Sequence, residues 1–141
     1  PPPPHPLPAA SCPGAAVGAA AVGAADLSDD ALLQVEAALR HLDAAVELVP
    51  TMGEAHVLRG AVLRGAGRLG ESEAALRTAL RLAEKSRQPM QAYFALRGFG
   101  ETMLKAGRER EALRALEAAL RINPQDAAIA QFLAARAGGP R

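Results

Sequence analysis

The sequence predicts an all-α fold of stacked helical hairpins, an α-solenoid, and two observations lead to this prediction. The residues from 26 onward are dominated by Ala, Leu, Arg and Glu, which favour helix, and they show no period-two strand pattern. The chain also repeats itself at a spacing of 40 positions, since Gly60, Gly67 and Ala79 recur as Gly100, Gly107 and Ala119. Units of about this length are pairs of helices that stack on their neighbours, because one pair cannot bury its apolar face alone.

The first expected helix covers residues 29–49. Ser28 supplies a hydroxyl cap, and Asp29 and Asp30 follow at the positive end of the helix dipole. Pro50 ends this helix. A second helix is expected over residues 53–65 and a third over residues 71–85, with the turn between them made by glycines.

Three more helices are expected in the second half of the chain. Pro89 opens a helix over residues 89–106, which ends before Gly107, and another helix covers residues 108–122. Pro124 follows that helix, and Asp126 is placed to cap the last helix, residues 127–137.

The ends of the chain differ from this helical part. Residues 1–25 are rich in Pro, Gly and Ala and carry no charge, so all 16 basic and all 15 acidic residues come later. A segment with so little apolar bulk does not offset the entropy of ordering it. We therefore expect a disordered leader over residues 1–25, a helical domain over residues 26–137 and a flexible tail over residues 138–141.

The leader itself allows two interpretations. Its proline run is either a ligand for an aromatic-lined module or a spacer, and a spacer is the simpler interpretation. The apolar stretch of residues 15–25 is too short to cross a bilayer, which takes about 20 residues. Because no basic region precedes it and the sequence begins at Pro1, we expect the chain to be a processed or excised part of a longer protein.

Charge and residue types exclude several function classes. Basic and acidic residues nearly balance, so neither nucleic acid nor membrane insertion is expected. Cys12 has no partner for an internal disulfide, which fits a reducing compartment, and we expect a cytoplasmic location. His5, His41 and His56 are not at metal-ligand spacings, and no set of nucleophile, base and acid stands out. We expect no metal, no cofactor and no enzymatic activity.

The repeated positions carry a family resemblance. Small residues at Gly60 and Gly100 would let two helices meet closely, glycines make the turns, and prolines end the units. Together these positions resemble the tetratricopeptide repeat family, whose unit is two antiparallel helices in 34 residues, the separation of Ala45 and Ala79. The resemblance covers about two and a half repeats and a terminal capping helix, and it implies a right-handed superhelix. The positions that carry it are Ala38, Ala45, Pro50, Gly60, Gly67, Ser72, Ala79, Gly100, Gly107, Ala112, Ala119 and Pro124.

The resemblance also implies a binding surface. In this family the first helix of each unit lines a concave groove. Phe94 would be an anchor in that groove if it is not a packing residue, and the charged members are otherwise a solvated face. The carboxylate clamp that some members use is absent, so the C-terminal tails of chaperones are not expected as ligands. The groove candidates are Val57, Ala61, Arg64, Phe94, Arg97, Glu101 and Lys105.

The expected function is a non-catalytic protein–protein interaction module, an adaptor or scaffold that binds a partner helix or peptide. One alternative is a regulatory or targeting segment of a larger enzyme whose catalytic domain lies outside this chain. Another is self-association through the exposed ends of the stack, near Leu32 and Val35 or near Phe132.

Overall fold

The computed structural model describes residues 28–137, and the expectations for residues 1–25 and 138–141 lie outside this range. The described part is all-α, with no strand. Each expected helix is present, with ends that differ from the expected ones by at most two residues. The helices are α2 (Asp29–Leu48), α3 (Gly53–Gly65), α4 (Leu69–Lys85), α5 (Pro89–Lys105), α6 (Glu109–Ile122) and α7 (Ala127–Ala137).

Two of the helix starts use the caps that the sequence predicts. The Ser28 hydroxyl accepts the backbone N–H of Ala31 at 3.1 Å, at the start of α2. A carboxylate oxygen of Asp126 accepts the backbone N–H of Ile129 at 3.0 Å, at the start of α7. Each bond satisfies one of the amides that a helix start leaves without an intrahelical partner.

The glycine turns are also confirmed. Gly67 and Gly107 have φ angles of 80° and 78°, in the left-handed region that favours glycine. In both turns the next backbone N–H reaches back to a carbonyl, from Arg68 to Leu63 and from Arg108 to Met103, at 2.9 Å. The α4 helix begins at Leu69, two residues before the expected start, and α6 begins at Glu109, one residue after it.

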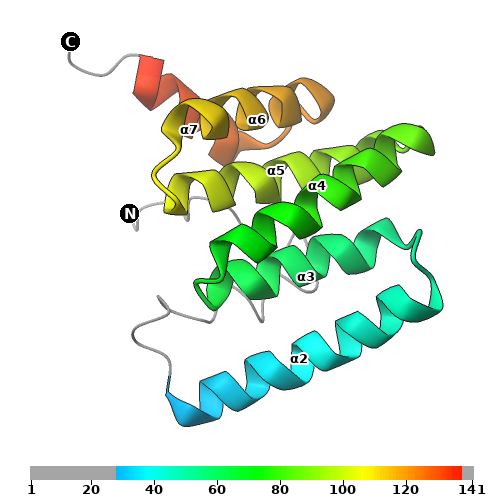
Figure 1. Cartoon of the computed structure of the whole chain (residues 1–141). Coiled ribbons are helices and arrows are strands. Elements are labelled where there is room, and N and C mark those ends of the chain that lie inside the picture. The colour runs from blue at the N-terminus through cyan, green and yellow to red at the C-terminus, as the bar shows by residue number, and fades with distance from the viewer. Residues whose placement is uncertain (1–27, 138–141) are drawn as a thin grey trace.

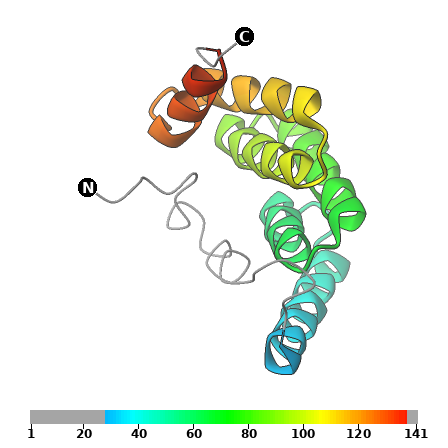
Figure 2. The same ribbon diagram turned by 90° about the vertical axis from the view of Figure 1, so that its left-hand side faces the viewer.

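The helices pack in chain order (Figure 1). Each contacts the helix before and after it in the sequence, and α3 also contacts α5. In the view of Figure 2 the helices form a curved stack, with α3 and α5 towards the inner side of the curve and α4 towards the outer side.

The two hairpins α3–α4 and α5–α6 are held together at glycines. A Cβ atom added at Gly60 would lie 2.6 Å from Cγ of Leu76, and one added at Gly100 would lie 2.6 Å from Cδ2 of Leu116. Because side chains never approach so closely, each glycine gives its leucine the space to pack against the helix backbone. Leu76 and Leu116 are 1% and 2% exposed.

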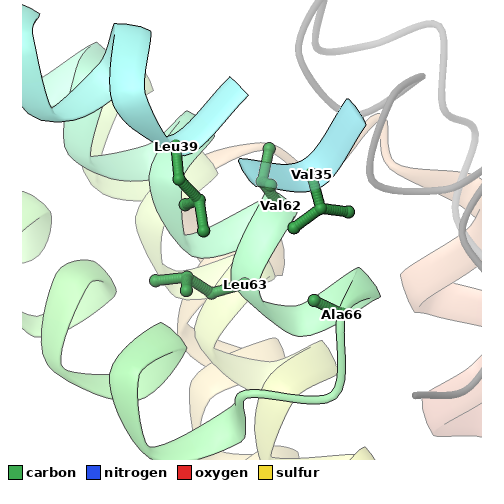
Figure 3. Packing of buried hydrophobic residues seen from close by; sticks show 5 residues of the cluster. All are labelled: Val35, Leu39, Val62, Leu63 and Ala66. Carbon is green, nitrogen blue, oxygen red and sulfur yellow. The ribbon is translucent and has the colours of Figure 1, made fainter. Parts of the chain in front are cut away.

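The α2 helix packs on α3 through a smaller cluster. Val35 and Leu39 of α2 lie against Val62, Leu63 and Ala66 of α3, as Figure 3 shows. Among the described helices α3 is the main neighbour of α2, so most of the circumference of α2 is left uncovered.

Candidate functional site

One stripe of α5 holds most of the side chains considered for binding. Phe94, Arg97, Glu101 and Lys105 follow one another at spacings of three and four residues, and Met90 precedes them by four. Met90 is 49% exposed, Lys105 is exposed, and Phe94 and Glu101 are half-buried. Sequence reasoning missed Met90, although its spacing from Phe94 would have identified it.

The two apolar candidates on α3 lie in the core. Val57 is 7% exposed and packs with Ala79 and Ala95, and Ala61 is 4% exposed. Their positions on the inner helix therefore serve the packing between α3, α4 and α5. Neither side chain offers a partner the surface that the resemblance implied, so we leave both out of the binding surface.

An ion pair joins α3 to α5. Arg64 Nη2 lies 3.0 Å from Oε1 of Glu101, and Arg64 Nη1 donates a hydrogen bond to the carbonyl of Gly98 at 3.3 Å. Both partners keep some contact with solvent, since their side chains are 14% and 23% exposed. Burial raises the pKa of Glu101 above its usual value, against the opposing effects of Arg64, Arg97 and Lys105. Of these cations, Arg64 makes the direct ion pair with Glu101.

Arg97 has a different environment from the one expected. It is 6% exposed, and its Nε lies 3.8 Å from a carboxylate oxygen of Asp126. The Tyr93 hydroxyl donates to the same oxygen at 2.5 Å, and the pKa of Tyr93 is raised, first by burial and then by this bond. Arg97 therefore helps to hold the start of α7, and it is corrected from a groove residue to a buried one.

Phe94 serves the core on one side. Its ring centroid lies 4.9 Å from that of Tyr93, and it packs against the clusters that contain Val57 and Leu116. It is only half-buried, so part of its side chain stays accessible to solvent. The packing interpretation of Phe94 is confirmed, and its role as an anchor for a partner stays a prediction.

A buried pair of hydroxyls lies behind this stripe. Ser72 donates to the Gly60 carbonyl at 2.7 Å, Thr102 donates to the Gly98 carbonyl at 2.9 Å, and the two hydroxyl oxygens are 3.0 Å apart. Ser72 and Thr102 are fully buried. The bonds satisfy both side chains within the packing of α3, α4 and α5, so Ser72 is structural, as its small-residue position predicted. Thr102 was not predicted, because a single threonine in a helix gives no sign of its partner 30 residues away.

The described residues offer little for other kinds of site. Between residues 28 and 137, no group of three or more His, Cys, Asp or Glu side chains could hold a metal ion. None of the helices α2 to α7 is long and apolar enough to cross a membrane. What the α5 stripe does present is an exposed apolar side chain, a half-buried aromatic ring and charges fixed by neighbouring helices.

Comparisons of the chain with protein-family models, with curated proteins and with solved structures found no match.

Proposed function

We propose that this chain is a non-catalytic protein–protein interaction module of the tetratricopeptide type. In this proposal the helices form a right-handed α-solenoid that binds a helix or an extended peptide of another protein on its inner side. The observation that supports it most is the recurrence of one set of contacts at a spacing of 40 residues. The glycine–leucine contact of the first hairpin recurs in the second, and so do the left-handed glycine turn and the arginine that follows it.

That arginine makes the same two kinds of ion pair in both places. Arg68 pairs with Glu71 at 2.8 Å, and Arg108 pairs with Glu111 at 2.7 Å. Each arginine also reaches a glutamate of an earlier helix, which is Glu36 of α2 for Arg68 at 3.5 Å and Glu73 of α4 for Arg108 at 2.8 Å. A repeated contact between successive units is what a stacked array of hairpins requires.

The proposed binding surface is the outward part of the α5 stripe with Arg64 beside it. Met90 and Phe94 supply apolar area, and Lys105 supplies a charge that a partner's carboxylate would meet. The ion pair between Arg64 and Glu101 orients both side chains before any partner arrives. A surface ordered in advance loses less conformational entropy on binding.

The test compares two charge reversals at matched positions. Lys105 is in the last turn of α5 and Lys85 is in the last turn of α4, so each reversal has the same unfavourable interaction with its helix dipole. The full chain, Lys105→Glu and Lys85→Glu are used as baits in a cell lysate, and captured proteins are identified by mass spectrometry. The proposal expects a partner that binds the full chain and Lys85→Glu but not Lys105→Glu.

Retention of the same partners by all three baits would contradict a binding surface at Lys105. Circular dichroism of each bait, with equal helix content, shows that a lost partner does not reflect a lost fold.

A further inference from the structure

Glu101 lies within the proposed α5 surface and keeps contact with solvent. Its side chain is 23% exposed, and its Oε1 lies 3.0 Å from Nη2 of Arg64. Lys105 follows it by four residues on the same stripe of α5, a spacing that places the two Cβ atoms about 6 Å apart. A partner that reaches Lys105 therefore comes close to this carboxylate.

The charged groups that act on Glu101 come from α3, from α5 itself and from the residue before α7. They are Arg64, Arg97, Lys105 and Asp126. The α4 and α6 helices meet α5 beside Glu101 through apolar side chains, with Leu76 close to Gly98 and Leu116 close to Gly100. Among the described residues, cations thus outnumber carboxylates in the electrostatic environment of Glu101.

Exposure decides which of these cations a partner can reach. Lys105 is exposed and forms no ion pair with another residue between 28 and 137. The Arg64 side chain is 14% exposed, whereas Arg97 is 6% exposed and lies against Asp126. The most accessible charge of the α5 surface is therefore positive, which favours an acidic segment of a partner over a basic one.

We propose that the α5 surface binds an acidic segment of another protein and that Glu101 takes up a proton from solvent when the segment binds. This inference rests on the function proposed above and adds a dependence on pH to it. The surface then binds its partner more tightly as the pH falls.

A carboxylate of the partner acts on Glu101 in one direction. When it pairs with Lys105, it offsets the attraction between Lys105 and the carboxylate of Glu101, and it adds a like charge nearby. The bound segment also removes solvent from Glu101. Each of these effects disfavours the ionised form, so each raises the pKa of Glu101 in the complex.

The free chain already holds Glu101 in this direction. Burial raises its pKa above the usual value, against the opposing effects of the neighbouring cations. Between the pKa of the free chain and the higher pKa of the complex, the complex binds more protons, so affinity rises as the pH falls through that range. Each unit by which binding raises the pKa corresponds to about a tenfold gain in affinity.

The first measurement is made on the full chain alone. The carboxyl carbon of Glu101, followed by nuclear magnetic resonance, should titrate above about pH 4.3, the usual value for glutamate. A midpoint at or below that value would overturn the inference and would leave the proposed function unaffected.

The second measurement uses a rhodamine-labelled peptide of four leucine–aspartate repeats as the acidic probe. Its aspartates stay ionised between about pH 5.5 and pH 7.5, since their usual pKa is about 3.9. Binding to the full chain is followed by fluorescence anisotropy at both pH values. We expect affinity to be about threefold or more higher at the lower pH, which corresponds to a rise of about half a pKa unit.

Three variants make this titration specific. Glu101→Gln, a neutral side chain of the same shape, should abolish the difference between the two pH values. Glu84→Gln is the matched control and should retain it, because Glu84 is exposed in the last turn of α4, the helix on the outer side of the stack (Figure 2). Lys105→Glu should weaken binding at both pH values.

The inference is overturned if the affinity of the unchanged chain is the same at both pH values, or if Glu101→Gln retains the difference, which would assign it to other groups such as the histidines. Absence of saturable binding that Lys105→Glu weakens would also overturn it. In that case the baits in the lysate still decide whether the surface binds a partner of another kind. Equal helix content of all variants by circular dichroism excludes unfolding as the cause.

Discussion

The hairpins α3–α4 and α5–α6 are alike where their own two helices meet and differ where each meets its C-terminal neighbour. Glycine over leucine, the left-handed glycine turn and the arginine after it are common to both. Position 57 of α3 and position 97 of α5 correspond, but the first is a valine among alanines and the second is an arginine beside Asp126.

This difference shows which positions of the unit are free to vary. Val57 faces the next hairpin, which is apolar there, so an apolar side chain is suitable. Arg97 faces the start of α7, where Asp126 caps the helix and brings a carboxylate into a buried place. A cation there offsets the cost of burying that charge. The contacts inside a hairpin are thus shared by the two units, and the contacts towards the C-terminal neighbour are specific to each.

Among the contacts that differ between the two hairpins, those of Asp126 should contribute most to the free energy of unfolding. Asp126→Ala loses the cap of α7 and the hydrogen bond from Tyr93, and it leaves Arg97 buried without this carboxylate. We expect a loss of about 2–4 kcal/mol in the free energy of unfolding, measured by urea denaturation. Ser28→Ala, which removes an exposed cap, should cost about 1 kcal/mol or less. Equal losses in the two variants would show that the Asp126 contacts add nothing beyond the cap.

Adding a methyl group at Gly60 or Gly100, the glycines that occupy the same position in the two hairpins, should have the next largest effect on stability. Gly60→Ala and Gly100→Ala each force the leucine beneath to move, because the added Cβ would lie 2.6 Å from it. We expect each variant to lose about 1–3 kcal/mol of stability in urea denaturation. Gly70→Ala is the control, since this helical glycine has nothing within 4 Å of an added Cβ. It should gain up to about 1 kcal/mol from helix propensity, and a similar gain at Gly100 would refute the close contact.

A glycine substitution in the turn between the two hairpins should raise the free energy of unfolding, whereas replacing the glycine of a turn inside a hairpin should lower it. Arg87 has a φ of 54° in the place where the other two turns have glycine. Arg87→Gly should therefore raise the free energy of unfolding by about 0.5–1 kcal/mol, because glycine adopts this conformation without a steric cost. Gly107→Ala, which meets no neighbouring atom but has a φ of 78°, should lower it by about 1 kcal/mol. A loss of thermal stability in Arg87→Gly would contradict this explanation.

Substitutions of two glutamates, Glu73 and Glu101, should have the smallest effects on stability. The contributions of the two carboxylates to stability depend on pH in opposite directions. Hydrogen bonds from Arg77 and Arg108 lower the pKa of Glu73, so its contribution is present at neutral pH and is lost as the pH falls through its folded pKa. Burial raises the pKa of Glu101, so its ionisation reduces stability as the pH rises from its usual pKa through the raised one.

The matching variants separate these contributions. At about pH 7, Glu73→Gln should be less stable than the unchanged chain by up to about 1 kcal/mol, and Glu101→Gln should be as stable or slightly more stable. Both differences should shrink in urea denaturation at about pH 4, near the usual glutamate pKa. A Glu101→Gln variant that loses more stability than Glu73→Gln at pH 7 would mean that the ion pair with Arg64 outweighs burial.

The sequence was enough to predict the helices and the contacts inside each hairpin, because local signals carry them. Ser28, Gly67 and Pro89 mark helix ends, and the recurrence of Gly60 as Gly100 identifies the close contacts. The all-α class is confirmed, and the order of helices agrees with their short connections.

The surroundings of the candidate binding residues could not be predicted in the same way. Family position alone placed Val57, Ala61 and Arg97 in a groove, but burial depends on what each residue meets across the stack. The bond from Tyr93 to Asp126 spans 33 residues and leaves no periodic pattern in the sequence. Contacts of this kind are specified by packing in three dimensions, which is why the sequence did not reveal the ion pair between Arg64 and Glu101 or the approach of Arg97 to Asp126.

The most direct test of the central claim, that one hairpin is built twice and stacked, is a nuclear Overhauser measurement on the intact chain. We expect strong contacts from the Leu76 methyl groups to the Gly60 α-protons, and equally strong ones from the Leu116 methyl groups to the Gly100 α-protons. Weaker contacts from Leu76 to Gly98 should accompany them, since an added Cβ at Gly98 would lie 3.0 Å from Leu76. Absence of either glycine–leucine pair would contradict the repeated hairpin.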